Sequence, residues 1–557
     1  MIYIYIIIAV ILIIGAYIYE IYKRRKRLRE RILKSYGEKI NIKNAKVNFE
    51  YVRSYFRNKK DNEKFFIDDI TWNDLNMDEV FKSMNNTQTS IGEEILYCIL
   101  RIPLFDKCEL IWRDEIIDYF MRNSKDRFKI QFTLGEYGKK DSACITNYFK
   151  EPKKPNKDKL LLYRSLRIIP FIFVILTIIK PVLAFLVMIS IGINIILNWR
   201  IKNKHKFEIQ DYMYMLGMIN TANKVYSLNI EYINNKFLHI KDSLNNLKSI
   251  RNKVILDDSN MYMSDASIWK MYKDNVMLSD IIKYEKILNI LYKKVDDFKN
   301  IYEYMGYIDS LISIASYRDS LDSYTKPILE KSSEKKEYLE SKDLYHPFIE
   351  EPVKNSINID KFILITGSNA SGKSTFLKTL ALNAITAQSI YTVYAEEYKS
   401  SYFRVYSSMA LKDSIFTKES YYMVEIKSLK RILDSIPLEY PILCFVDEIL
   451  RGTNTIERIA ASSEVLNHLA ESKNCICVAA THDIELTYIL EKNFNNYHFQ
   501  EEIKDNDIIF DYKLYSGRSK TRNAIKILSF IGYDKEIVDR AYDRARVFTK
   551  TNKWQEI

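Results

Sequence analysis

The feature that most constrains this chain is the loop at residues 367–374, which reads Gly-Ser-Asn-Ala-Ser-Gly-Lys-Ser and follows the apolar run 362–366. Glycines at both ends let the backbone turn its N–H groups toward a phosphate, and the N-terminus of the following helix adds positive potential. Lys373 would place its charge on the β- and γ-phosphates, and Ser374 would offer its hydroxyl to Mg²⁺. The pattern predicts an ATP-binding loop between a buried strand and a helix, rather than a glycine loop without a ligand.

A second buried strand is predicted at residues 441–446, and it ends in Asp447-Glu448. Open parallel sheets bind their ligands at the C-terminal ends of their strands. We expect Asp447 to hold Mg²⁺ together with Ser374, and Glu448 to act as the general base that orients the attacking water. The alternative is a solvated acidic pair that caps a helix. The predicted nucleotide-binding residues are Gly367, Ser368, Asn369, Ala370, Ser371, Gly372, Lys373, Ser374 and Thr375.

A third apolar run, at residues 475–480, ends in Thr481-His482-Asp483. A lone histidine is usually structural, but one that ends a strand beside the acidic strand can reach the γ-phosphate. That role depends on the order of the strands, which residue spacing alone does not prove. We predict that His482 is a second catalytic residue.

The pattern of residue types changes along the chain. From 207 to about 325 the pattern is helical, with no glycine between Gly217 and Gly306, which predicts long helices packed as a bundle or as levers. After Pro347 short β-rich runs alternate with amphipathic helices, which is typical of a mostly parallel sheet. Residues 522–548 are expected to form two short helices. The predicted fold is therefore an α/β ATPase domain with an all-α core domain.

The N-terminal segment is apolar from residue 2 to residue 19, and a basic run follows at 23–27. A cleaved signal peptide would carry its charge before the apolar run. The reversed order predicts an uncleaved membrane anchor whose basic flank lies in the cytoplasm, rather than a buried core helix.

A second apolar block, 168–197, is interrupted by Lys180-Pro181 and has basic residues on both flanks. Equal positive flanks imply that the chain leaves and returns on the same side of a membrane. We expect a hairpin of 168–179 and 182–198 with Lys180 at the turn. A re-entrant or surface-lying hairpin is the alternative, because about 12 residues are short for a full span.

With 557 residues the chain has room for three or four domains, and its net charge of +12 would suit nucleic acid or an acidic membrane surface. Its six cysteines are scattered without metal-ligand spacing. Those in the Cys475-x-Cys477 run are predicted to be small core residues of a buried strand.

Several motifs together resemble the ATPase domain of the MutS mismatch-repair family, a branch of the ABC-type ATPases. The loop is similar to the family's Thr-Gly-Pro-Asn-Met-x-Gly-Lys-Ser-Thr. The segment from Asp447 to Thr453 resembles Asp-Glu-Leu-Gly-Arg-Gly-Thr, and Ala480-Thr481-His482 matches Ala-Thr-His. A His-Pro lead at 346–347 and a Ser-Thr-Phe-Met-x-Glu-like segment at 420–425 belong to the same resemblance, and a core-domain start at 87–92 is a weaker likeness.

The resemblance implies a homodimer with composite sites, in which Ser420 of one subunit completes the nucleotide pocket of the other. It also implies that ATP binding moves the lever helices, that DNA is a partner, and that the C-terminal helices support the dimer. Ser368, Ser371 and Leu450 depart from the family pattern. We also expect neither the N-terminal mismatch-reading domain nor a nuclease-like tail.

The sequence thus predicts a membrane-anchored, ATP-hydrolysing protein that binds DNA, with its ATPase domain in the cytoplasm. A membrane switch acting on a protein or lipid partner is the alternative, and a transporter is disfavoured because three apolar segments cannot line a path. The predicted boundaries are anchor 1–22, basic linker 23–69, first core part 70–160, transmembrane hairpin 168–198, helical lever domain 207–340, ATPase domain 345–521 and C-terminal dimerisation segment 522–557.

Overall fold

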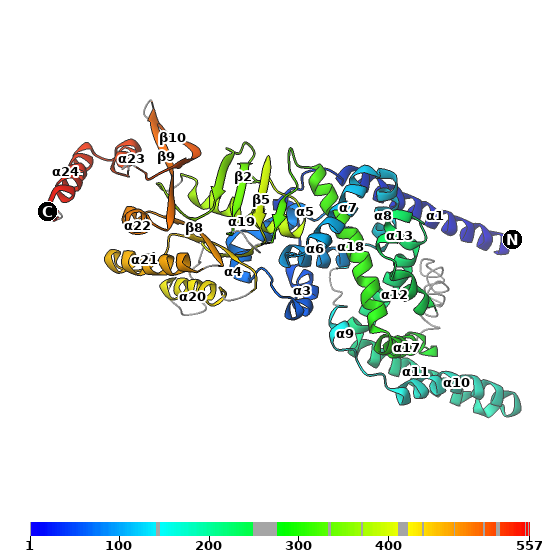
Figure 1. Cartoon of the computed structure of the whole chain (residues 1–557). Helices are drawn as coiled ribbons and strands as arrows, with labels where there is room; N and C mark the ends of the chain where they lie inside the picture. Colours follow the sequence, from blue (N-terminus) through cyan, green and yellow to red (C-terminus); the bar gives the residue numbers. More distant parts are fainter. Residues whose placement is uncertain are drawn as a thin grey trace. The chain divides into compact units, whose positions relative to one another are not determined.

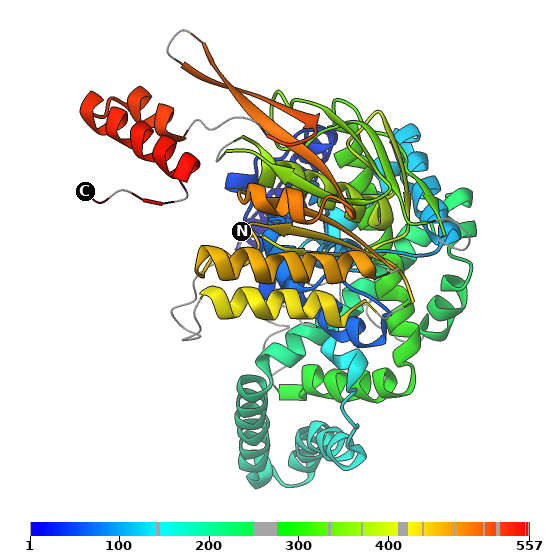
Figure 2. The same cartoon turned by 60° about the vertical axis from the view of Figure 1, so that its left-hand side comes forward.

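The computed structural model describes residues 2–140, 145–248, 276–331, 336–368, 371–409, 421–436, 439–472, 474–504, 507–519, 524–551, 553–554 and 556. Its contacts divide the chain into two compact units, which Figures 1 and 2 show from two sides. The helical unit comprises Met1–Lys64, Phe81–Ile99 and Trp112–Ser320, and the sheet unit comprises Phe65–Val80, Leu100–Ile111 and Leu321–Ile557.

The helical unit contains the long helices that the glycine-poor sequence predicts. Its described helices are α1 (Ile2–Ser35), α2 (Phe49–Val52), α3 (Ser54–Lys59), α8 (Ser124–Tyr137), α9 (Asn147–Lys150), α10 (Lys157–Ile179), α11 (Ala184–Lys204), α12 (Lys206–Tyr226), α13 (Glu231–Lys236), α14 (Ile240–Asn246), α17 (Ser279–Lys293) and α18 (Val295–Asp319), with short 3-10 turns η1 (Ile42–Asn44), η2 (Lys60–Asn62) and η3 (Pro181–Leu183). Three helices run across the boundary between the units: α5 (Met77–Met84), α6 (Ser90–Arg101) and α7 (Lys107–Arg122).

The centre of the helical unit is α18, whose last turns are almost wholly buried. Asp309 on α18 accepts hydrogen bonds from the backbone N–H groups of Gln88 and Thr89, at 2.9 and 2.8 Å, just before α6 begins. Burial raises the pKa of the Asp309 carboxyl to about 6. The 87–92 segment therefore starts a helix that is fixed to α18 by a buried carboxylate.

The sheet unit is built on a six-stranded sheet of order β10-β9-β4-β8-β7-β6, parallel except where β10 pairs antiparallel with β9. Its strands are β4 (Phe362–Thr366), β6 (Arg404–Ser408), β7 (Ile442–Asp447), β8 (Cys475–Thr481), β9 (Phe494–Lys504) and β10 (Asp507–Ser516). The mostly parallel sheet was predicted, whereas the β9–β10 hairpin was not. Cys475 and Cys477 are buried in β8, as the sequence predicts.

The same unit also contains helices and a smaller sheet. The helices are α4 (Asp69–Asp74), α19 (Lys373–Ser389), α20 (Tyr421–Asp434), α21 (Thr455–Glu471), α22 (Ile484–Ile489), α23 (Ala524–Ile531) and α24 (Lys535–Thr551). The smaller sheet has the order β1-β5-β2-β3, from β1 (Ile328–Glu330), β5 (Glu397–Ser401), β2 (Leu339–Leu344) and β3 (Asn355–Ile359). Figures 1 and 2 both show α20 and α21 running alongside each other.

Two early segments belong to the sheet unit, although the sequence boundaries assign them to the helical core. Asp74 at the end of α4 accepts hydrogen bonds from the Ser407 hydroxyl at 2.7 Å and from the Met409 N–H at 2.9 Å. Farther along, the Leu104 N–H donates to the Gln388 carbonyl at 2.7 Å. Hydrogen bonds between residues some 300 positions apart leave no periodic trace in a sequence, which is why this assignment was missed.

Within the part of the chain that the structure describes, two helices are long and apolar enough to cross a membrane, α10 and the stretch Pro181–Lys204 that contains α11. They form the expected hairpin with Lys180 between them, but both helices continue past the apolar block into its basic flanks. Helix α1 is continuous through the predicted anchor and its basic run. Most side chains of its first fourteen residues lie outside the described structure, so the anchor at 1–22 stays a prediction.

Candidate functional site

The glycine-rich loop lies between β4, buried along its whole length, and the first turn of α19. Gly367 has φ of 149° and Gly372 has φ of 105°, and both are conformations that a residue with a Cβ rarely adopts. A Cβ on Gly367 would also lie 2.9 Å from the Phe499 carbonyl oxygen. The two glycines are therefore required by the backbone of the loop itself.

Lys373 begins α19 and folds back into the loop. Its Nζ donates to the carbonyl oxygens of Gly367 at 2.9 Å and Ser368 at 2.8 Å. Burial lowers the pKa of the amine, while the nearby carboxylates of Asp447, Glu448 and Glu501 favour its charged form. The loop thus holds a positive charge at its centre with acidic groups around it.

Asp447 ends β7 and has a carboxylate that matches the demands of a hard cation. Its Oδ1 is buried and has no hydrogen-bond partner among the residues that the structure describes. Burial raises the pKa of the carboxyl, and a hydrogen bond from Ser374 opposes that shift. Ser374 itself is exposed at the start of α19. A hydroxyl and an unsatisfied carboxylate oxygen side by side fit the oxygen ligands that Mg²⁺ prefers.

Glu448 and His482 meet because β8 lies between β4 and β7 in the sheet. His482 Nε2 lies 2.9 Å from Glu448 Oε1 and 3.5 Å from Lys373 Nζ. The second carboxylate oxygen of Glu448 is 2.6 Å from Arg451 Nη1. The strand order on which the predicted role of His482 depends is therefore present.

A buried carboxylate on α20 holds the loop that follows Glu448. Glu425 accepts hydrogen bonds from the backbone N–H groups of Leu450 and, at 3.1 Å, of Arg451. Leu450 has φ of 55°, the left-handed region that favours glycine. The family pattern has a glycine at this position, so the departure noted in the sequence falls on a residue with a strained backbone.

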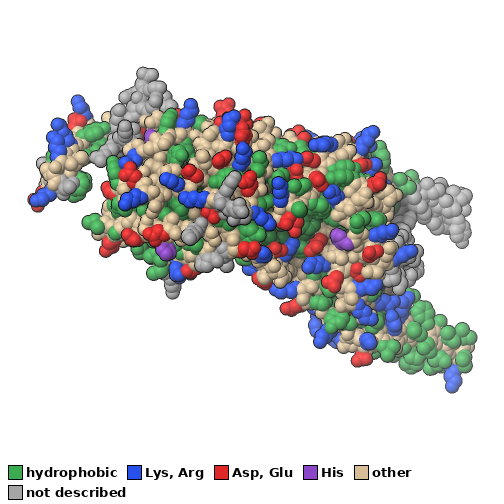
Figure 3. Space-filling view, in the orientation of Figure 1, with side chains coloured by type: hydrophobic (Ala, Val, Ile, Leu, Met, Phe, Trp, Pro, Cys, Tyr) green, Lys and Arg blue, Asp and Glu red, His purple; other side chains and the backbone are tan. Residues whose placement is uncertain are grey.

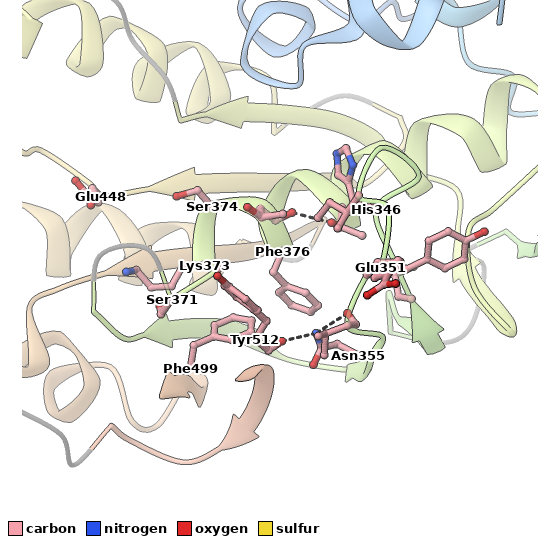
Figure 4. Close-up of a pocket in the computed structure, with 18 residues that line it drawn as sticks. His346, Glu351, Asn355, Ser371, Lys373, Ser374, Phe376, Glu448, Phe499 and Tyr512 are labelled. Atoms are coloured by element: carbon pink, nitrogen blue, oxygen red, sulfur yellow. Dashed lines mark hydrogen bonds between the residues drawn. The ribbon is translucent and has the colours of Figure 1, made fainter. Parts of the chain in front are cut away.

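The loop opens on a cavity of about 510 Å³, which Figure 4 shows with its lining side chains. At one end lie Lys373, Ser374 and Glu448, and His346 and Asn355 come from the segment before β4. Burial lowers the pKa of His346 to about 4, so its imidazole is neutral at pH 7. The cavity is thus lined by charged groups at the loop and by a mixture of polar and apolar side chains elsewhere, among them Glu351.

Tyr512 of β10 covers the loop from the side of the β9–β10 hairpin. A Cβ on Gly372 would meet its ring at 3.2 Å. The tyrosine stands at an irregularity in the β9–β10 register, and its carbonyl accepts from Asn355 Nδ2 at 3.0 Å. The described structure gathers the predicted residues Gly367, Ser368, Ser371, Gly372, Lys373, Ser374, Thr375, Asp447, Glu448 and His482 around the loop and its cavity. Asn369, Ala370 and Ser420 lie outside the described residues.

Sequence reasoning missed several residues of this site. Asn355 and Tyr512 lie in strands without a motif, and only the three-dimensional structure brings them to the loop. Arg451 and Glu425 stood inside the quoted motifs, but a motif does not say what a side chain contacts. His346 belongs to the His-Pro pair of the family resemblance, but that resemblance assigns the histidine no role.

Comparison with known proteins agrees with these motifs. Residues 363–549 match the family described as MutS domain V. The DNA mismatch repair protein MutS of Pseudothermotoga lettingae is 28% identical over 294 residues, covering 51% of this chain and 35% of that protein. Residues 363–549 are thus similar to domain V of the MutS family.

Other MutS-family relatives match to a similar extent. The DNA mismatch repair protein MutS of Caldanaerobacter subterraneus is 29% identical over 275 residues, covering 47% of this chain and 31% of the relative. The MutS protein homolog 4 of Homo sapiens is 32% identical over 258 residues, covering 43% of this chain and 26% of the relative. The chain spans about a third of the length of the curated relatives it matches.

Proposed function

We propose that this MutS-like protein is a membrane-anchored ATPase that acts as a homodimer and binds DNA. The ATP part is carried by one observation: the loop and Glu448 line a single cavity, and Asp447 is hydrogen-bonded to Ser374 of the same loop. Similarity to relatives that are named DNA mismatch repair proteins supports the DNA part. A net charge of +12 favours the same partner, because backbone phosphates attract basic proteins.

In the proposed reaction one group of residues binds the phosphates and another encloses the rest of the nucleotide. The loop N–H groups and Lys373 bind the β- and γ-phosphates, and Tyr512 with His346 encloses the rest of the nucleotide. Ser374 and Asp447 would hold Mg²⁺, which neutralises phosphate charge when it is bound. Glu448 takes the proton of the attacking water, and His482 orients Glu448 through their 2.9 Å contact.

The ion pair between Glu448 and Arg451 gives this reaction a point of control. A base held by two partners has less freedom to accept a proton, so hydrolysis requires Glu448 to exchange one of them for water. Glu425 ties the same loop to α20, the helix that follows Ser420. A partner subunit that contacts the start of α20 through Ser420 would therefore act on the loop that carries Arg451.

The test is ATP hydrolysis by the detergent-solubilised full-length protein, with homoduplex, mismatched and branched DNA added in parallel. We expect basal turnover and a change on addition of at least one DNA. Binding should weaken steeply with added salt, because phosphate contacts release counterions. Absence of turnover would refute the ATPase, whereas turnover that ignores every DNA would refute only the DNA partner.

A second candidate function keeps the ATPase and replaces DNA by a membrane-bound partner. The exposed apolar surface of α10 and α11 favours it, because the repair function does not by itself require such a surface. Deletion of residues 1–35 together with the hairpin should then abolish the action on the membrane-bound partner, while ATP hydrolysis continues. Full function of the soluble remainder would exclude the membrane switch.

A further inference from the structure

The α10–α11 hairpin has the reverse of the polarity found in a water-soluble protein. The buried residues of α11 are all polar: Ser190, Asn194 and Asn198. The apolar side chains point outward instead, with Ile178 81% exposed and Met188 75% exposed. Large apolar side chains normally gather inside and polar ones outside. A pair of helices with polar groups between them and apolar groups around them is suited to hydrocarbon.

One of these buried polar residues, Asn194, donates a hydrogen bond to a backbone carbonyl that has no donor in its own helix. Pro170 lies inside α10 and has no N–H, so the carbonyl of Leu166 loses its helical donor. Asn194 Nδ2 of α11 donates to that carbonyl at 3.0 Å. Its amide donates in addition to the Val276 carbonyl, at 2.9 Å, just before α17. The contact therefore supplies a donor to a carbonyl that Pro170 leaves without one, at the base of the hairpin.

The Asn194 contacts also fix the hairpin to the helical unit. Tyr163 of α10 packs in a cluster with Ile281 and Ile282 of α17, and Leu166 and Ile201 contact the same cluster. The base of the hairpin is thus part of a folded core. Beyond it lie the charge-free arms, whose exposed side chains are mostly isoleucine, valine, phenylalanine and methionine.

A set of basic side chains, here called the basic collar, surrounds the base of the hairpin. Figure 3 shows the projecting hydrophobic surface with one basic side chain near its end and basic side chains gathered at its base. No collar residue forms an ion pair with a described residue, in contrast to Lys153 with Glu208 and Lys202 with Asp280. The collar consists of Lys157, Arg164, Arg167, Arg200 and Lys204, all exposed.

The lengths agree with entry into a membrane from one side. The charge-free stretch of α10, residues 168–179, is about 18 Å long at 1.5 Å per residue. A hydrocarbon core is about 30 Å thick, and the long side chains of Arg167 and Lys180 can extend toward headgroups from either end. Asp158 is the acidic residue of α10, and α11 has none. Such a surface repels a basic partner and attracts an acidic one.

We propose that α10 and α11 enter a bilayer tip first, and that the basic collar binds the headgroups of anionic phospholipids. The proposal deepens the membrane part of the proposed function and is independent of the nucleotide site. Each unpaired lysine or arginine near an anionic surface adds attraction that falls off within a Debye length. The hairpin supplies insertion, and the collar supplies the preference among lipids.

The experiment follows the hairpin itself, because α1 could hold the chain on a vesicle alone. A fluorophore sensitive to polarity is attached to Met188→Cys in the full-length chain, with Cys108→Ser and Cys144→Ser to remove competing thiols. The protein is mixed with vesicles of phosphatidylcholine alone or with part of it replaced by phosphatidylglycerol. We expect a blue shift and quenching by lipid-attached quenchers, at lower lipid concentration with phosphatidylglycerol.

Two pairs of variants separate the steps. The double change Arg164→Gln and Arg167→Gln should raise the concentration of phosphatidylglycerol vesicles that produces the blue shift by roughly 10- to 30-fold. The control double change Lys125→Gln and Lys241→Gln should leave that concentration unchanged. Asn194→Leu should lower thermal stability in vesicles more than Asn203→Leu, which alters an exposed asparagine of the same helix.

Each outcome bears on one part of the proposal. A fluorophore that stays in water overturns insertion, and equal affinity for both vesicle types overturns headgroup binding by the collar. ATP hydrolysis is measured in the same samples. Intact hydrolysis with no lipid response would therefore refute this inference and leave the nucleotide site standing.

Discussion

The buried strands of the sheet unit and the hairpin of the helical unit use nearly the same apolar residues in opposite ways. Strands β4, β7 and β8 bury their apolar side chains. Their polar residues stand at the ends, where Asp447 and His482 meet at the loop. The hairpin keeps Ser190 and Asn194 inside and presents isoleucines outward. The polar groups thus lie at the C-terminal ends of the strands in one region and on the buried side of α11 in the other.

The two regions have similar composition and differ in what covers their apolar side chains. A strand of five to seven residues can be covered on both faces by the helices of its own domain. A hairpin of two longer helices that extends beyond the folded core has no such cover. The four predictions that follow test the two regions, beginning with the largest expected effect.

The largest effect is expected at the end of β7. Glu448→Gln should retain ATP binding but lower the turnover number at least ~100-fold, because the amide cannot take a proton from water. Nucleotide binding is followed with a fluorescent ATP analogue and turnover by phosphate release. Undiminished turnover would show that another residue is the base, and Asp447 would be examined next.

A charge introduced on the hairpin should weaken its insertion into vesicles, whereas a charge introduced on the sheet unit should not. Ile175 on α10 is 62% exposed and Ile456 on α21 is 79% exposed, so they form a matched pair. Ile175→Glu should weaken insertion of the labelled hairpin into vesicles roughly 70-fold, from about 2.5 kcal/mol for a charge in hydrocarbon. Ile456→Glu should have no effect on the label. Equal effects would remove the contrast between the regions.

A smaller effect is expected at Tyr512, which lies over the glycine-rich loop. Tyr512→Ala should raise the KM for ATP roughly 3- to 10-fold and change the turnover number little, because an aromatic contact contributes about 0.5–1.5 kcal/mol. Tyr512→Phe serves as the control and should behave like the natural protein. A loss of turnover at unchanged KM would assign the tyrosine a part in the chemistry instead.

The smallest effect concerns acid and the buried imidazole. Burial lowers the pKa of His346 to about 4, so the unfolded chain binds a proton at higher pH than the folded one. The neutral, buried imidazole of His346 therefore adds its full contribution to the free energy of unfolding above pH 6.5. That contribution is lost as the pH falls toward 4. Between pH 7.5 and 6 the free energy of unfolding should fall by about 1 kcal/mol less in His346→Gln than in the natural protein. Denaturant titration at both pH values measures the difference.

The elements themselves were largely predictable. The run 362–366 became β4 without a change of boundary, and the helix after it begins at Lys373 because a left-handed glycine must precede it. The break at Gly532 separates α23 from α24. Local chemistry decides such features, since apolar periodicity and glycine positions are written in consecutive residues.

The amino-acid sequence by itself determined the glycine-rich loop, its acidic strand and their resemblance to the MutS family. Tertiary structure alone decided that β8 lies between β4 and β7, which brings His482 to Glu448. It likewise decided that Asn194 completes the helix that Pro170 interrupts. The physical reason is the same in both cases: a motif fixes the conformation of neighbours in the chain, whereas contacts between distant segments depend on how whole elements pack.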